Sequence, residues 1–372
     1  MKQFGVVSYN IYCNFTNYGS ALQSWALCRA IDKLSDGSWR SVLVDYCPDV
    51  LRDKDPLNPV KNMWDSDEES RRMCMLSMPA IRVNAEKFDR FYRERFRRTK
   101  GSYTSENFDR IAEEEIDGFV CGSDTIFCID EFGGFDDGYY ANYPCMKNGY
   151  AVSYAASFGD AHFKEETYRL LAEKLNNFKA LGLRESTMVP FAREHTQFPV
   201  RRVIDPTLLL EPADYEQITA PVQREGKYLL LYTRRYNPRM EAFAEKLAKE
   251  NGWDIIEISL RAVNAEKRAM RYDAGVEEFL SLVKHAQFVV TNSFHGMIFS
   301  VQFRRPFYVF SREQCDTKIA ELLSLLGLSD RLLISGAEGA AAEIDYDQVH
   351  ERIAAEREGS LAFLRDELQN CP

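Results

Sequence analysis

Several short groups of polar residues directly follow apolar runs, a position that suits side chains that bind or react with a ligand. The first group is NFTNYGS, from Asn14 to Ser20. Asn and Gly tolerate a positive φ, and the N–H groups at the start of a following helix can bind an anion or a sugar hydroxyl. In that case Asn17, Tyr18 and Gly19 contact the acceptor of a transfer reaction. A plain strand–helix turn with Ser20 as N-cap explains the same residues.

The second group is Gly122-Ser123-Asp124, after the apolar residues FVC. A carboxylate at the end of a strand can act as a general base or orient a sugar hydroxyl. We therefore take Asp124 as a candidate catalytic residue and Ser123 as a candidate acceptor contact. An Asp that only caps the next segment is the alternative.

The third group runs from Thr291 to Gly296 and leads from an apolar strand into an apolar helix. His295 falls in the first turn of that helix, where it could accept a proton. The same helix end attracts phosphate or carboxylate, so Asn292 and Ser293 are candidate donor contacts. A histidine with only a structural hydrogen bond is the alternative.

Two further groups contain arginines. Arg234 and Arg235 end the apolar stretch KYLLLYT, and two guanidinium groups there suit a planar anion. A solvated surface pair is the other interpretation. Arg184 ends the apolar stretch LGL, where a buried charge needs Glu185 or a ligand as its partner.

Other kinds of site have little support. The five histidines form neither HxxxH nor HExxH, and no GxGxxG or GxxxxGK[ST] motif is present. Asp136 and Asp137 could hold a divalent ion, but a flexible acidic loop explains them better. We expect no metal and no cofactor apart from a donor substrate.

The apolar runs predict two α/β domains. Strands at 4–10 and 41–46 flank a helix at 20–34, a βαβ unit that predicts a parallel sheet. The strand–helix rhythm restarts after a polar stretch at 211–226, so we place one Rossmann-like domain at 1–215 and another at 226–372. Further strands are predicted at 119–124, 149–159, 181–186, 201–209, 227–233, 253–259, 287–293 and 305–310, and further helices at 85–98, 164–177, 241–252, 276–286, 295–303 and 319–328.

Two segments are less regular. Residues 50–80 contain Pro56, Pro59 and the run DSDEESRR, which predicts a loop or mobile flap. The last residues, from about 340, predict one or two surface helices that pack back toward the first domain.

The charge, the apolar runs and the cysteines argue against several classes of protein. The net charge of −10 argues against sequence-independent binding of nucleic acid, which depends on neutralising phosphates. No apolar run is long enough to span a bilayer. Nine irregularly spaced cysteines predict free thiols in a reducing compartment, and we expect a cytoplasmic protein.

Taken together, several segments resemble the polysaccharide pyruvyl transferase family. They occur in the family's order over about residues 4–330, and they are NYGSALQSWAL (17–27), FVCGSDTIF (119–127), YAASFG (154–159), LGLRES (181–186), VIDPTLLL (203–210) and FVVTNSFHGMIFSVQFRRPFYVF (288–310).

The resemblance implies a GT-B-like fold, in which two Rossmann-like domains face each other across a cleft. It also implies transfer of pyruvate from phosphoenolpyruvate onto two hydroxyls of a sugar, giving a cyclic ketal. His295 and Arg184 match the family's positions for donor binding or proton transfer. The family pattern Arg-Leu-His is Ser293-Phe294-His295 here, so Arg234 or Arg235 would have to replace the missing cation, or the donor is held differently.

Phosphoenolpyruvate and a sugar or lipid-linked oligosaccharide are the expected partners, and a lipid-linked acceptor would bring the protein to a membrane surface. Two other functions remain open: a GT-B glycosyltransferase that uses a nucleotide sugar, and a non-catalytic sugar-binding component of a polysaccharide assembly system. The sequence does not indicate an oligomeric state.

Overall fold

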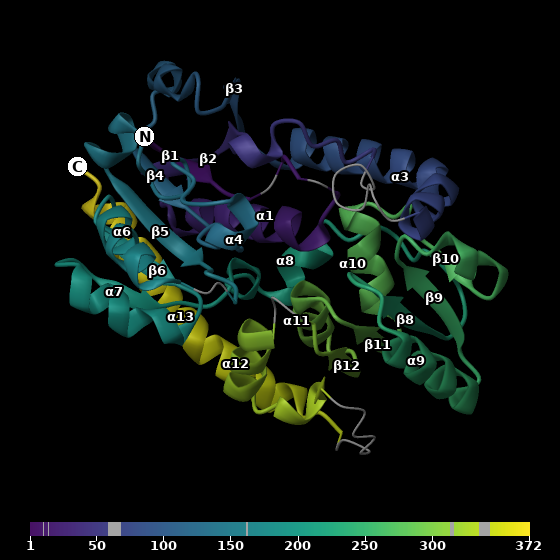
Figure 1. Ribbon diagram of the computed structural model, residues 1–372. Coiled ribbons are helices and arrows are strands. Elements are labelled where there is room, and N and C mark those ends of the chain that lie inside the picture. Colours follow the sequence, from purple (N-terminus) through teal and green to yellow (C-terminus); the bar gives the residue numbers. More distant parts are fainter. Residues whose placement is uncertain (10, 14, 59–67, 161–162, 313–315, 335–342) are drawn as a thin grey trace.

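The computed structural model describes residues 1–9, 11–13, 15–58, 68–160, 163–312, 316–334 and 343–372. Its strands form two separate parallel sheets, one in each half of the chain (Figure 1). The strand orders are β3-β2-β1-β4-β5-β6-β7 and β10-β9-β8-β11-β12-β13. Apart from β7 the two orders are equivalent, and both are the Rossmann order. The predicted pair of Rossmann-like domains is confirmed.

The N-terminal sheet is covered by helices on both faces. Its strands are β1 (Lys2–Val7), β2 (Trp39–Tyr46), β3 (Arg98–Tyr103), β4 (Gly118–Cys121), β5 (Ala151–Ala156), β6 (Ala180–Leu183) and β7 (Val200–Arg202). The helices of this half are α1 (Tyr18–Leu34), α3 (Glu68–Arg95), α4 (Ile129–Phe132), α5 (Pro144–Lys147), α6 (Glu165–Leu175) and α7 (Val189–His195). Strands β4 and β5 are buried along their whole length and β1 from its third residue on, because helices exclude water from both sides.

The C-terminal sheet is built in the same way. Its strands are β8 (Tyr228–Tyr232), β9 (Asp254–Ile258), β10 (Ala269–Met270), β11 (Phe288–Thr291), β12 (Phe307–Phe310) and β13 (Leu332–Leu333). The remaining helices are α8 (Pro212–Glu216), which leads to this sheet, α9 (Pro238–Asn251), α10 (Val276–His285), α11 (Phe294–Gln302), α12 (Asp316–Leu326) and α13 (Tyr346–Asn370).

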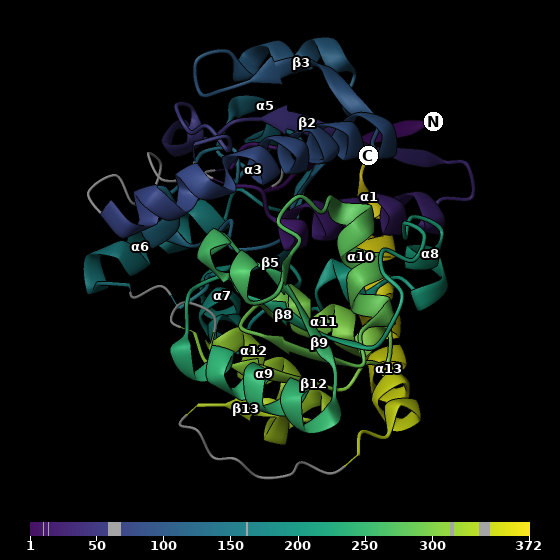
Figure 2. The ribbon, with the colours of Figure 1, turned by 90° about the vertical axis from the view of Figure 1, so that its right-hand side faces the viewer.

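Two long helices connect the halves. Helix α13 leaves the C-terminal half beside α12 and ends near the N-terminus (Figure 1). Near its middle, the Ser360 hydroxyl accepts a hydrogen bond from the amide of Ile204 at 3.1 Å. Helix α3 lies along the other side (Figure 2), and its Ser77 hydroxyl donates to the carbonyl of Leu260 at 3.0 Å. The halves are therefore in direct contact. The domain limits at 215 and 226 remain a prediction.

The structure corrects two local expectations in the N-terminal half. Residues 68–80 belong to α3 rather than to a loop, because buried residues such as Cys74, Ser77 and Ile81 recur at helical spacing although Pro79 interrupts the pattern. Residues 59–67 of the predicted flap lie outside the described residues. The strand predicted at 201–209 ends at Arg202, and a short 3-10 helix begins at Pro206.

The final segment forms one helix, α13, which is more than a surface helix. It buries Val349, Ile353 and Phe363 along one face. The eight cysteines that the structure describes form no disulfide, and Cys315 lies outside the described residues.

Candidate active site

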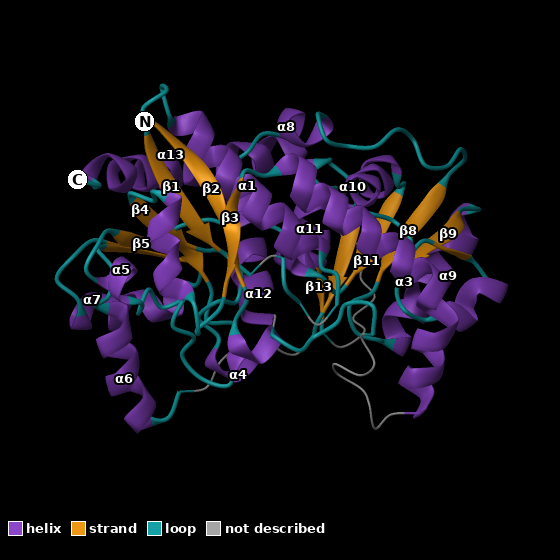
Figure 3. Cartoon of the chain, turned by 90° about the horizontal axis from the view of Figure 1, so that it is seen from above, coloured by secondary structure: helices purple, strands orange, loops and turns teal. Residues whose placement is uncertain are grey.

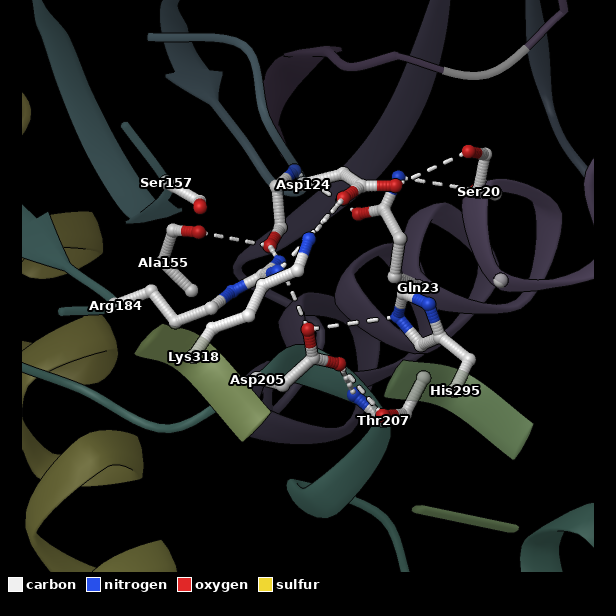
Figure 4. A network of polar contacts seen from close by, with 12 residues as sticks. Ser20, Gln23, Asp124, Ala155, Ser157, Arg184, Asp205, Thr207, His295 and Lys318 are labelled. Atoms are coloured by element: carbon white, nitrogen blue, oxygen red, sulfur yellow. Dashed lines mark hydrogen bonds and ion pairs between the residues drawn. The ribbon is translucent and has the colours of Figure 1, made fainter. Parts of the chain in front are cut away.

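A cluster of charged side chains lies where the two halves meet (Figure 4). Asp124, Arg184 and Asp205 come from the N-terminal half, and His295 and Lys318 come from the C-terminal half. Each of the five is at most 7% exposed, so the cluster is shielded from bulk water. Most of them follow the carboxyl ends of strands, the edge at which ligands bind in doubly wound folds. Figure 3 shows the strands of the two sheets as separate groups with helices around them. This cluster is the strongest candidate for an active site.

Asp124 follows β4 with a φ of 67°, a left-handed conformation that aspartate tolerates. Its Oδ2 accepts a hydrogen bond from the Ser20 hydroxyl at 3.1 Å. Its Oδ1 lies 3.7 Å from Arg184 Nη1 and 3.8 Å from Lys318 Nζ. Burial raises the pKa of Asp124, but Lys318, His295 and Arg184 together lower it below its usual value. Asp124 is therefore an ionised acceptor between two cations.

Arg184 follows β6, and its partner is Asp205 rather than Glu185. Its Nη2 lies 2.8 Å from Asp205 Oδ2 and donates to the Ser123 hydroxyl at 2.5 Å. Glu185 instead accepts hydrogen bonds from the hydroxyl of Ser157 and the amide of Phe158. Nε and Nη1 of Arg184 are buried and have no hydrogen-bond partner among the described residues. Two donor groups of this guanidinium thus remain for an anion.

Asp205 was not singled out from the sequence, although it lies within the quoted segment VIDPTLLL. It is the N-cap of the 3-10 helix at Pro206–Leu208, and its Oδ1 accepts from the amide and the hydroxyl of Thr207 at 2.9 and 2.5 Å. Its Oδ2 lies 3.6 Å from His295 Nε2. Burial raises the pKa of Asp205, but Arg184 and His295 lower it more, and the result lies well below the usual range.

His295 occupies the first turn of α11, as the sequence predicts. The N-cap is Ser293, whose hydroxyl accepts a hydrogen bond from the amide of Gly296 at 3.2 Å. The imidazole packs closely against Gly19 in α1, where a Cβ would lie only 2.1 Å from His295 Nδ1. Glycine at position 19 is therefore what allows the ring to reach the opposite half of the molecule.

Lys318 is the second residue that sequence reasoning missed. It lies in the first turns of α12, a helix whose sequence shows no motif around it. Its Nζ and the Arg184 guanidinium both lie 5.3 Å from the centre of the Phe294 ring, a cation–π arrangement. Within the described residues, the cation that the C-terminal half contributes to this cluster is Lys318.

The predicted donor contacts Arg234, Arg235 and Asn292 are not among the residues labelled in Figure 4. The Arg234 guanidinium lies 4.2 Å from the Phe15 ring centre, and Arg235 is exposed. The Asn292 side chain accepts from the Arg234 amide at 2.8 Å and donates to the Arg235 carbonyl at 2.6 Å. Asn292 therefore fixes the β8–α9 loop and Ser293 caps α11, and donor binding by either residue remains a prediction.

The predicted acceptor contacts also have structural roles. The N-cap of α1 is Asn17 rather than Ser20, and its side chain accepts from the amides of Gly19 and Ser20. Tyr18 is buried, and its hydroxyl donates to the carbonyl of Ala274 at 2.7 Å. Ser123 donates to the carbonyl of Ala155 at 2.9 Å. Acceptor binding by these side chains remains a prediction, because each already has a partner within the protein.

Among the residues that the structure describes, no three His, Cys, Asp or Glu side chains gather as ligands for a metal ion. No helix in the described ranges has the length and apolarity that crossing a membrane requires.

The cluster combines two cations, two carboxylates and one imidazole in a site with little water. Buried guanidinium and ammonium groups bind a multiply charged anion strongly, because charge-assisted hydrogen bonds are strongest where the local dielectric is low. An imidazole beside them can transfer a proton to or from the bound molecule.

The model of the polysaccharide pyruvyl transferase family matches residues 17–314. The chain belongs to this family. The match includes Asp124, Arg184, Asp205 and His295, whereas Lys318 follows its end.

Solved structures support the fold of this pyruvyl transferase family member. A candidate UDP-N-acetylglucosamine 2-epimerase from Listeria monocytogenes aligns with a TM-score of 0.50 at 10% identity, covering 100% of this chain and 91% of the other. The MnaA–UDP structure from S. aureus aligns with a TM-score of 0.49 at 12% identity, with the same two coverages. The fold is of the GT-B type, as expected. No curated protein matches the sequence significantly.

Proposed function

We propose that this protein transfers pyruvate from phosphoenolpyruvate onto two hydroxyls of a sugar, forming a cyclic ketal. The observation that carries the proposal is the meeting of Arg184, Lys318 and His295 from opposite halves at one buried point. Phosphoenolpyruvate has a phosphate and a carboxylate close together, and two cations side by side match that pair of charges. Membership of the pyruvyl transferase family supports the same donor.

Donor binding is assigned to the two cations. Among the described residues, Arg184 has two nitrogens without a hydrogen-bond partner, and the ion pair between Lys318 and Asp124 is a loose one at 3.8 Å. Lys318 can therefore bind an anion without breaking a short ion pair. Arg184 can bind one through its free nitrogens while it keeps its ion pair with Asp205. Asp124 then remains ionised beside the donor and can accept a hydrogen bond from a sugar hydroxyl.

The proton transfers are assigned to His295. The first acceptor hydroxyl adds to C2 of phosphoenolpyruvate, and its proton passes through the imidazole to C3, which becomes a methyl group. The C2–phosphate bond then breaks, and the second hydroxyl adds at C2 while its proton leaves with the phosphate. Phosphoenolpyruvate and a diol thus become a ketal and inorganic phosphate, with all atoms accounted for. This scheme calls for no metal and no further cofactor.

The acceptor is proposed to be a sugar or a lipid-linked oligosaccharide in the cytoplasm, where phosphoenolpyruvate is available. Because the neighbouring structures include proteins solved with UDP, a nucleotide sugar is the alternative donor to test. A protein that binds sugar without catalysis would bind neither donor at this cluster.

The test compares donors and then variants. Thermal shift and calorimetry should detect phosphoenolpyruvate but not a panel of nucleotide sugars, and phosphate release should require a sugar acceptor. Lys318→Gln should raise the KM for phosphoenolpyruvate about 10- to 100-fold, the effect of losing one hydrogen bond to a charged group. Lys284→Gln, which removes a surface ion pair with Glu216, is the matched control and should leave KM unchanged. Binding of nucleotide sugars in place of phosphoenolpyruvate would overturn the proposal.

A further inference from the structure

Asp205 has one carboxylate oxygen fixed by the protein and one directed at the cluster. Oδ1 is held by both donors of Thr207, and the following residue is Pro206, so the carboxylate has little freedom. Its side chain is fully buried. Oδ2 lies between Arg184 Nη2 at 2.8 Å and His295 Nε2 at 3.6 Å (Figure 4).

Nε2 of His295 is buried and has no hydrogen-bond partner among the described residues, and Asp205 Oδ2, which is paired with Arg184 as an ion pair, makes no hydrogen bond of good geometry there. Buried polar atoms of this kind are rare, because an unmade hydrogen bond at a buried site is costly. The two atoms face each other at a distance only slightly longer than a hydrogen bond. Contacts at catalytic sites are often long in the absence of ligand and shorten when it binds.

We propose that Asp205 is a positioning residue for His295. Its carboxylate oxygen accepts a hydrogen bond from Nε2–H and so holds the neutral ring in that tautomer. The other nitrogen, Nδ1, is then the atom that exchanges protons with the reactants. A carboxylate that fixes one ring nitrogen determines in this way which nitrogen is left to react.

The surroundings of Nδ1 fit this assignment. Nδ1 lies next to Gly19, and a Cβ at that position would come within 2.1 Å of it. The neighbouring residue, Ser20, donates its hydroxyl to Asp124. An acceptor hydroxyl that Asp124 orients is therefore close to the start of α1, which Nδ1 faces. Its O–H bond breaks as an Nδ1–H bond forms, and the imidazolium produced is stabilised by the Asp205 carboxylate.

The same carboxylate joins proton transfer to anion binding. Asp205 contacts both the cation that binds the donor and the ring that moves the proton, so it fixes the two relative to each other across the junction of the halves. The role in the reaction rests on the proposed function. The tautomer of His295 does not, and it can be measured without any substrate.

The experiment is 15N NMR of the full-length protein labelled at histidine, at a pH at which the His295 ring is neutral. The chain has five histidines, and His295→Gln identifies the signal by its loss. In the wild-type protein, the proton is expected on Nε2. A wild-type proton on Nδ1 overturns the proposal, whatever the variants do.

Two variants then separate positioning from structure. Asp205→Asn should lose the preference for Nε2–H and, with phosphoenolpyruvate and an acceptor, should reduce kcat about 100-fold or more with a smaller change in KM. Thr207→Val is the matched control, because it removes a hydrogen bond to the other oxygen, Oδ1, and should keep both the tautomer and near-wild-type turnover. Equal tautomers in the wild-type protein and Asp205→Asn would overturn the proposal. If no variant uses phosphoenolpyruvate but the tautomers behave as expected, the proposed function fails and the positioning role of Asp205 stands.

Discussion

At the scale of single residues, Gly19 and His295 pack against each other from opposite halves of the molecule. A methyl group at position 19 would occupy the space of the ring, so Gly19→Ala should displace the imidazole and lower turnover at least tenfold. The matched control is Gly359→Ala in α13, where a Cβ meets nothing within 4 Å. That variant should keep turnover and gain about 0.5–1 kcal/mol in the free energy of unfolding. Turnover and urea denaturation of both variants check the prediction, which fails if Gly19→Ala is fully active.

His295 itself gives the second prediction. His295→Ala should lower turnover about 10²–10⁴-fold, the usual contribution of a general acid–base group, while the fold is retained. His295→Gln keeps much of the side chain's volume and its hydrogen bonding but cannot transfer a proton, and should be as inactive. The measurements are turnover and melting temperature of both variants. A His295→Ala protein that melts several degrees lower but turns over normally would show that the residue is structural.

At the scale of elements, the start of α1 brings Gly19 and Ser20 to the site, and Asn17 caps it. Asn237 caps α9 through the same pair of backbone contacts, with amides of the second and third helical residues. Each Asn→Ala variant should therefore lose about 1 kcal/mol in the free energy of unfolding. If Asn17 acts only as a cap, neither Asn17→Ala nor Asn237→Ala should change the KM for the acceptor. A raised acceptor KM for Asn17→Ala alone would restore the acceptor role predicted from the sequence.

At the scale of the whole molecule, buried charges join the halves through Asp124 with Lys318 and Asp205 with His295. The pKa of each of these carboxyls in the folded protein lies below its usual value of about 3.9. The unfolded state therefore binds more protons as the pH falls, and the stabilisation present above about pH 5 is lost progressively below it.

The fourth prediction follows from these lowered carboxyl pKa values and concerns stability in acid. The free energy of unfolding of the wild-type protein should fall steeply from pH 5 toward pH 3, and Asp205→Asn should be less stable at pH 7 but show a shallower slope. Asp53→Asn, on an exposed turn, is the control and should keep the wild-type slope. Urea unfolding at several pH values measures these slopes. An unchanged slope in Asp205→Asn would mean that this carboxylate does not contribute to the acid sensitivity.

The sequence by itself determined the two Rossmann-like halves, because apolar runs of strand length alternate with amphipathic helices. It also determined that His295 starts a helix after an apolar strand, and that Arg184 and Asp124 follow strands. These features depend on residues near one another in the chain, so periodicity and turn residues are enough to find them.

Only the tertiary structure decided which of these residues meet. Asp205 and Lys318 are 113 positions apart in the sequence, and local patterns give no sign that both reach the same cluster. The same holds for Gly19, which is conspicuous only as a turn residue until the His295 ring is seen against it. Arg234 and Arg235, by contrast, had a suitable pattern, but the contacts described for them are with Phe15 and Asn292, and their donor-binding role remains a prediction. The physical reason is that side chains of a buried site are brought together by the packing of one half on the other, and that packing is not encoded in any single segment.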